Sequence, residues 1–308
     1  MAEERWWYHR PASPPFGARP MNSPIPKKLV RNGQPTLHYV LAGPAAGLSA
    51  KGSVLVIHGY AEHGGRYLEL IEALVVRGYL VAALDLRGHG LSEGFRGHCD
   101  AFDDYLLDVD VLLEELARDP AWSGSGKPVL LGHSFGGLIA FHSALANPGR
   151  ARGIFLSSPF FGIKLAVPVV KRAAARLLSR IVPTFGLPSG LSGRDVSHDP
   201  EKIKEYDEDP LNGKKATARW YTETVAAHAR AFEQAPSFHA PLEIFAAAAD
   251  RVVSPEATRA VFDRVGSARK TLTMLEGQFH EIFNEVDRKA TIQRAVDRID
   301  GLFAPAPQ

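Results

Sequence analysis

The stretch PVLLGHSFGGLIAFHSA, from Pro128 to Ala144, places one serine between two glycines where an apolar run ends and a helical pattern begins. The run before Gly132 has the continuous apolar character of a buried strand, and the residues after Gly136 have that of a buried helix. The segment GHSFG fits the pattern G-x-S-x-G, which is typical of a sharp strand-to-helix turn. Side chains two residues before and after the serine would collide there, so both glycines are expected to be required.

Ser134 is therefore a candidate nucleophile. The turn would lift its hydroxyl clear of the sheet and place it at a helix N-terminus, where the helix dipole favours negative charge. The structural alternative is a serine that only caps the helix. A serine hydroxyl is a weak nucleophile without a neighbouring base, so the chain must also supply a base and a group that orients it.

Apolar runs alternate with segments of helical spacing along most of the chain, and this alternation predicts an α/β fold with a mostly parallel sheet flanked by helices. Several runs are continuously apolar, as expected for strands covered on both faces. The predicted strands are Thr36–Leu41, Val54–Ile57, Leu80–Leu84, Val129–Leu131, Ile154–Leu156, Leu242–Ala249 and Thr271–Leu275. The predicted helices are Tyr67–Val76, Phe102–Leu116, Leu138–Asn147, Pro255–Val265 and Asp287–Phe303.

The alternation stops between residues 160 and 236, where no convincing strand is found. One helix is expected around residues 167–181, with an apolar and a basic face, and a second within 213–233. We predict four parts: an N-terminal extension (1–24), poorly ordered; the first part of the core (25–159); a helical insertion (160–236); and the second part of the core (237–308).

Asp250 and His280 are the candidate partners of Ser134. In hydrolases with this turn the order along the chain is serine, acid, histidine. Asp250 ends the apolar run PLEIFAAAAD, and His280 follows the predicted strand TLTML across a loop. Both should lie at the carboxyl edge of the sheet, as Ser134 does, so Asp250 could hold the His280 imidazole in the tautomer that accepts a proton.

The backbone N–H groups of Phe135 and Tyr60 are the candidate donors to an oxyanion. Gly59, at the end of another predicted strand, would let the chain approach the ester closely. We interpret His58 as a residue that fixes this loop through hydrogen bonds. Other polar residues compete for catalytic roles but are expected to be structural: His142, His198, His228, His239, Asp85, Arg87, Asp199, Asp207 and Asp209.

Composition narrows the function classes. The formal charge of +2 gives no strong field for nucleic acid, and a single cysteine, Cys99, excludes a disulfide framework or a site of several thiolates. The predicted chemistry requires no metal and no organic cofactor. The sequence contains no secretory signal and no run long enough to cross a bilayer, so a cytoplasmic location is expected.

Several blocks together resemble the monoacylglycerol lipase and lysophospholipase family of α/β-hydrolases. These blocks are HGYAEHGGRY (58–67), DLRGHGLSEGFRGH (85–98), GHSFGG (132–137), SSP (157–159), DRVVSPEAT (250–258) and EGQFHEIFNE (276–285), and EYDEDPL (205–211) is similar to part of the family's cap. The resemblance implies the α/β-hydrolase fold, the triad of Ser134, Asp250 and His280, and the oxyanion donors Tyr60 and Phe135. It also implies that the insertion is a cap that bounds an acyl-chain pocket.

The resemblance implies a serine esterase acting on a single-chain lipid ester such as monoacylglycerol. The alternative substrate is a lysophospholipid or a general carboxylic ester. A less favoured hypothesis is a binding protein without catalytic activity. The triad alone does not exclude peptidase or peroxidase activity. The apolar face of the insertion (Val167, Val170, Leu177, Ile181) is expected to line the acyl pocket or to pack on the core. Its basic face suggests transient contact with a membrane surface. The oligomeric state does not follow from the sequence.

Overall fold

A computed structural model describes residues 24–44, 48–164 and 169–304. Its main sheet has eight strands in the order β1-β2-β4-β3-β5-β6-β9-β10. The first two strands run antiparallel to their neighbours, and the six strands from β4 to β10 are parallel to one another. The predicted α/β-hydrolase fold class, with its mostly parallel sheet, is confirmed.

The helices and strands have the following bounds. The strands are β1 (Ile25–Arg31), β2 (Gln34–Ala42), β3 (Gly52–Ile57), β4 (Tyr79–Leu84), β5 (Val129–His133), β6 (Gly153–Ser157), β7 (Gly186–Pro188), β8 (Lys215–Thr217), β9 (Leu242–Ala247) and β10 (Lys270–Leu275). The α-helices are α2 (Leu68–Val76), α3 (Asp103–Leu116), α4 (Pro120–Gly124), α5 (Phe135–Ala146), α6 (Val169–Ile181), α7 (Gly193–Val196), α8 (Pro200–Glu208), α9 (Ala218–Gln234), α10 (Pro255–Arg264) and α11 (Arg288–Phe303), with short 3-10 turns at Gly64–Tyr67 and Ala235–Ser237.

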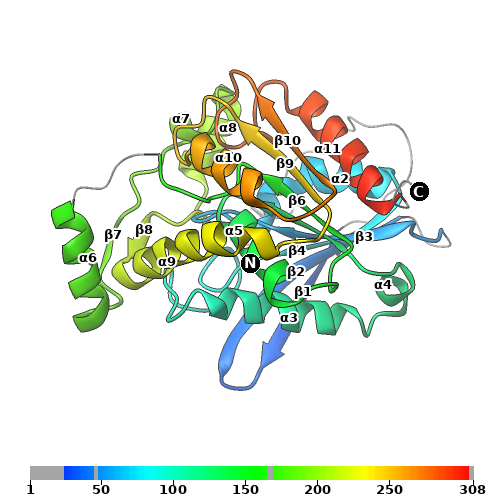
Figure 1. The fold of residues 1–308 in the computed structure, drawn as a ribbon. Helices are drawn as coiled ribbons and strands as arrows, with labels where there is room; N and C mark the ends of the chain where they lie inside the picture. The colour runs from blue at the N-terminus through cyan, green and yellow to red at the C-terminus, as the bar shows by residue number, and fades with distance from the viewer. Residues whose placement is uncertain (1–23, 45–47, 165–168, 305–308) are drawn as a thin grey trace.

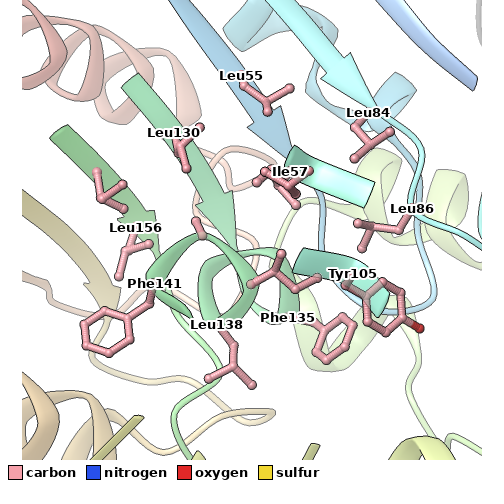
Figure 2. Packing of buried hydrophobic residues seen from close by; sticks show 14 of the residues in the cluster. Leu55, Ile57, Leu84, Leu86, Tyr105, Leu130, Phe135, Leu138, Phe141 and Leu156 are labelled. Atoms are coloured by element: carbon pink, nitrogen blue, oxygen red, sulfur yellow. The ribbon is translucent and has the colours of Figure 1, made fainter. Parts of the chain in front are cut away.

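Helices cover both faces of the sheet (Figure 1). Alternate side chains of each strand point to opposite faces, so β3 sends Leu55 and Ile57 to one core and Val54 and Val56 to the other. The first core contains α3, α5 and α10, and the second contains α2 and α11. Figure 2 shows the first core around the start of α5. The apolar run of the opening stretch is therefore buried on both faces, as a central strand requires.

Three strands were not predicted. In β1 only Leu29 is buried, and the lysines beside it give the segment no apolar run. The expectation that residues 160–236 contain no strand is wrong, because β7 and β8 pair there as a two-stranded antiparallel sheet. Each has three residues, which is too short for a periodic signal, and the glycine and proline of β7 indicate a turn in the sequence.

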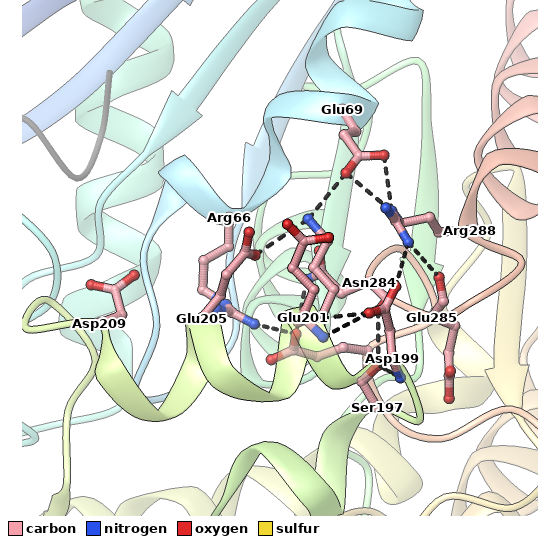
Figure 3. A network of polar contacts seen from close by, with 12 residues as sticks. Arg66, Glu69, Ser197, Asp199, Glu201, Glu205, Asp209, Asn284, Glu285 and Arg288 are labelled. Atoms are coloured by element: carbon pink, nitrogen blue, oxygen red, sulfur yellow. Dashed lines mark hydrogen bonds and ion pairs between the residues drawn. The ribbon is translucent and has the colours of Figure 1, made fainter. Parts of the chain in front are cut away.

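Residues 160–236, called the cap segment below, are tied to the core by ion pairs (Figure 3). Glu69 of α2 accepts hydrogen bonds from Lys202 of α8 and Arg288 of α11, each at 3.0 Å. Arg288 also donates to Asp199, at the start of α8, at 2.8 Å. Several partly buried pairs that share partners hold a position better than isolated surface pairs do, so α8 is fixed against the core. Within the described ranges, no helix combines the length and apolarity needed to span a bilayer.

Candidate active site

Ser134 lies on a strained turn between β5 and α5. Its backbone has φ 51° and ψ −116°, a region that residues with a side chain rarely adopt. The Ser134 N–H donates to the Ser157 carbonyl at 2.9 Å, and its own carbonyl accepts from Phe160 N–H at 2.9 Å. A Cβ on Gly132 would lie 2.3 Å from the Gly136 carbonyl oxygen, and this close approach explains the glycine.

Asp250 and His280 are in direct contact. Asp250 follows β9 and His280 follows β10, and the His280 Nδ1 lies 2.7 Å from Asp250 Oδ2, with both side chains buried. The second oxygen, Oδ1, accepts from the N–H groups of Val252 and Val253 at 2.8 and 2.9 Å. These two bonds fix the carboxylate, so Oδ2 faces the imidazole as an acceptor, and the proton of His280 sits on Nδ1.

His280 lies close to the end of β5, directly before the turn that carries Ser134. The ring of His133, next to Ser134 in the chain, lies with its centroid 4.8 Å from that of His280. Burial alone would lower the pKa of His280, but the Asp250 carboxylate and its hydrogen bond raise the pKa by more than burial lowers it. The nearby Glu281 and Glu62 raise it further. The pKa of His280 therefore lies above its ordinary value, and a negative environment stabilises the charged imidazole.

A buried charge network lies beside His280. Arg66 donates from Nε to Glu62 Oε2 at 3.2 Å and from Nη2 to the Glu281 carboxylate, and all three side chains are buried. Burial and the nearby Glu281 raise the pKa of Glu62 to about 6, against the lowering effect of Arg66. Sequence reasoning missed Glu281, whose only signal was its position directly after His280.

The loop that follows β3 is held tightly against the serine. Gly59 N–H donates to Glu62 Oε1 at 2.5 Å, and a Cβ on Gly59 would lie 3.2 Å from the Cβ of Ser134. His58 donates from Nδ1 to the Gly59 carbonyl at 2.6 Å while its Nε2 accepts from Leu86 N–H at 2.9 Å. Burial lowers the pKa of His58 to about 3, so it is neutral. Its expected role in fixing this loop agrees with these bonds.

Tyr60 joins this loop to the cap segment. Its ring packs on Trp220 of α9 with centroids 3.7 Å apart, and Trp220 also lies 5.2 Å from the ring of Phe135. The Tyr60 hydroxyl donates to the carbonyl oxygen of Lys215 in β8 at 2.6 Å. Trp220 thus covers the two residues expected to donate to an oxyanion. Sequence reasoning missed it, although a tryptophan on a helix of an insertion is a signal worth following.

The competing polar residues other than His228 have structural partners. Asp85 accepts from the N–H groups of Gly64 and Leu91 at 2.8 and 2.9 Å, so it braces two loops as expected. Arg87 pairs with Asp108. The other histidines and acids of this group bond to partners or cap a helix: His142 with the Ala227 carbonyl, His198 with Glu285, His239 with the Gly266 carbonyl, Asp199 at the N-terminus of α8, Asp207 with Gly193 N–H, and Asp209 with His63. The Nε2 atom of His228 has no partner among the described residues.

The residues expected to line an acyl pocket are not gathered around the serine. Val167 lies outside the described residues. Val170, Leu177 and Ile181 of α6 are 80%, 59% and 67% exposed. Figure 1 shows α6 at the outer end of the cap segment, beside α9. The helical spacing was correct, but α6 rests on α9 through another side, where Ser179 bonds to Thr222. The apolar face is therefore open to solvent in this structure.

Several known proteins are similar to this chain over most of its length. The family described as serine aminopeptidase, S33, matches residues 49–287. Phospholipase YtpA of Bacillus subtilis is 34% identical, over 79% of this chain and 92% of its own. The monoacylglycerol lipase of Mycolicibacterium smegmatis is 33% identical, over 79% of this chain and 85% of its own. The crystal structure of Paleococcus ferrophilus monoacylglycerol lipase has a TM-score of 0.78, with 31% identity over 86% of this chain and 99% of that one. The chain spans only 24% of a longer abhydrolase domain-containing relative from Dictyostelium discoideum, which is 31% identical.

Proposed function

The chain belongs to the serine aminopeptidase, S33, family of α/β hydrolases, and from this membership we propose that it hydrolyses carboxylic esters of single-chain lipids. The preferred substrate is monoacylglycerol, which gives glycerol and a fatty acid. The observation that carries the proposal is the 2.7 Å contact of His280 with Asp250 beside the strained turn of Ser134. The names of the similar lipases and the phospholipase support a lipid ester as substrate.

The proposed reaction uses only groups of this chain and water. The Ser134 hydroxyl attacks the ester carbonyl carbon while His280 takes its proton at Nε2. The N–H groups of Tyr60 and Phe135 stabilise the oxyanion. As the tetrahedral intermediate collapses, His280 returns the proton to the leaving alcohol. The same histidine then takes a proton from water, whose oxygen attacks the acyl-enzyme, and Ser134 is protonated as the fatty acid leaves.

A lysophospholipid is the second candidate substrate, and it is favoured by the similarity to a phospholipase. The chemistry at the carbonyl would be identical, since only the leaving alcohol differs. A comparison of monooleoylglycerol with a lysophosphatidylcholine of the same acyl chain separates the two, because the group beyond the ester oxygen is the only part that changes.

We also infer transient contact of the cap segment with a membrane surface, for a protein that works in the cytoplasm. The exposed apolar side chains of α6 lie on the same helix as the exposed arginines 172, 176 and 180. An exposed apolar face with basic flanks is typical of helices that lie in an anionic interface. Cosedimentation with vesicles should be stronger for phosphatidylglycerol than for phosphatidylcholine, and Leu177→Glu should weaken it. Equal, weak sedimentation with both vesicles would contradict the inference.

The proposed function is tested by fatty-acid release from monooleoylglycerol, with Ser134→Ala and His280→Ala as controls. We expect release by the natural chain and its loss in both variants, which should keep the circular dichroism spectrum of the natural chain. Near-normal turnover in either variant would refute the triad. No release from a protein that still cleaves p-nitrophenyl acetate would keep the triad and refute the lipid substrate.

A further inference from the structure

Three polar atoms on one face of α9 have no hydrogen-bond partner among the residues that the structure describes. They are Trp220 Nε1, Thr224 Oγ1 and His228 Nε2. The spacing of four residues places them in one row along the helix, which extends about 12 Å at a rise of 1.5 Å per residue. Trp220 and Thr224 are 6% and 2% exposed. We call these three side chains the polar row.

A second threonine of the same helix is fully paired, in contrast to Thr224. Thr222, two residues before Thr224, donates its hydroxyl to the carbonyl oxygen of Arg219 at 3.0 Å and also bonds to Ser179. Thr224 makes no such bond within the described chain. Native proteins rarely leave buried polar atoms unmatched, because the loss of hydration is then not compensated. Three such atoms in one row therefore point to a ligand that supplies their partners.

The polar row lies beside the proposed nucleophile. At one end, the ring of Trp220 covers Tyr60 and Phe135, with centroids 3.7 and 5.2 Å away. At the other end, the ring of His228 lies 4.6 Å from that of Phe160, whose N–H donates to the carbonyl of Ser134. A group bound along the row would extend from the reacting ester.

The direction of the row matches the acyl part of the substrate. His280 must protonate the leaving oxygen, so the alcohol lies toward His280. The oxyanion lies toward the N–H groups of Tyr60 and Phe135, and the acyl chain takes the remaining direction. The ring contact of His280 is with His133, whereas the ring contacts of the row are with Tyr60, Phe135 and Phe160.

We propose that the polar row selects acyl chains that carry an oxygen part-way along, such as hydroxy fatty acyl groups. This inference rests on the proposed ester hydrolysis and names its acyl class. Trp220 supplies a donor, and Thr224 can donate or accept. Burial lowers the pKa of His228 to about 4, so its imidazole is neutral at the pH of the assay. A chain hydroxyl can therefore donate to the row or accept from it.

The test compares monodecanoylglycerol with three analogues hydroxylated at carbon 4, 6 or 8 of the acyl chain, which sample the length of the row. One net hydrogen bond corresponds to a change of about two- to tenfold in kcat/KM. We expect the natural chain to prefer at least one hydroxylated ester by that factor. Thr224→Val, which keeps the shape and removes the hydroxyl, should reduce the preference. The matched control Thr222→Val on the same helix should retain it.

Two results would overturn the inference. One is a preference of the natural chain for the unsubstituted ester over all three analogues, a comparison that needs no variant. The other is a change by one common factor for all four esters in Thr224→Val and in the second variant His228→Phe. If the natural chain cleaves none of the four esters but still cleaves p-nitrophenyl acetate, the proposed function fails as well. Cleavage without a hydroxyl preference refutes only the acyl class.

Discussion

The substitution Asp250→Asn distinguishes the role of Asp250 in orienting His280 from its role in stabilising the fold. The two oxygens of Asp250 have different tasks: Oδ1 accepts from Val252 and Val253, and Oδ2 accepts from His280 Nδ1. An asparagine that keeps its carbonyl on the two backbone donors must turn its NH2 group toward Nδ1. His280 can then accept from that NH2 only in the other tautomer, with its proton on Nε2, and this tautomer cannot take the serine proton.

We expect kcat for the ester to fall by about 10⁴-fold in Asp250→Asn, since the wrong tautomer removes the general base while the oxyanion donors remain. The two backbone bonds persist, so the unfolding midpoint should change little. The assay is acid release from monooleoylglycerol between pH 5 and 9. In the natural chain the base must be neutral and its pKa is raised, so kcat/KM should rise with pH through a pKa above 6.5.

The control is Asp250→Glu, which retains the charge but is longer, and it should recover part of the activity. The reasoning is refuted if Asp250→Asn keeps more than about a tenth of kcat, because a tautomer effect of the stated size leaves no room for that. A fall in activity together with loss of the folded spectrum would instead mean that Asp250 supports the loop rather than the base.

Three further predictions concern stability. Gly136→Ala should lower the free energy of unfolding by about 1–3 kcal/mol, measured in urea, because its Cβ would lie 2.1 Å from the carbonyl oxygen of Ile57. Gly301→Ala, inside α11 with no described atom within 4 Å of the new Cβ, should raise the free energy by about 0.5–1 kcal/mol, and a decrease there would contradict the packing. Burial lowers the pKa of His58 to about 3 and of His142 to about 4, so the unfolded chain binds protons below pH 6.5 that the folded chain does not. The free energy of unfolding should therefore be at its full value above pH 6.5 and fall as the pH drops toward 4. In His142→Gln, the melting temperature should fall less steeply with decreasing pH.

The central part of the fold follows from the sequence because its signal is strong. Continuous apolar runs such as the one in β5 occur where helices cover both faces of a strand, and these runs predicted the parallel strands to within two residues or so. β1 has no such signal because it lies at the edge of the sheet with most side chains exposed. β7 and β8 pair with each other through three residue pairs in all, and such a short ladder leaves no periodicity in the sequence.

The site was partly predictable for a topological reason. The carboxyl ends of parallel strands meet at one edge, so residues after β5, β9 and β10 come together although they are far apart in the sequence. The catalytic roles themselves stay predictions. The cap segment was harder, because an amphipathic pattern identifies an apolar face on α6 without saying what that face contacts. The polar row of α9 could not be seen either, since its meaning depends on burial and not on residue type.

The hydrogen bond from the Tyr60 hydroxyl to the Lys215 carbonyl couples the position of the cap segment to that of the loop after β3. Residues 160–236 lie between β6 and β9, which both belong to the main sheet, so the segment invites exchange as a module. The hydrogen bond between Tyr60 and Lys215 argues against such an exchange. A cap grafted from a relative would have to reproduce the position of one backbone carbonyl, or it would shift the loop whose N–H is proposed to hold the oxyanion. Libraries that vary this segment should therefore lose turnover number before they lose solubility, and grafts chosen to preserve that carbonyl should be the ones that keep it.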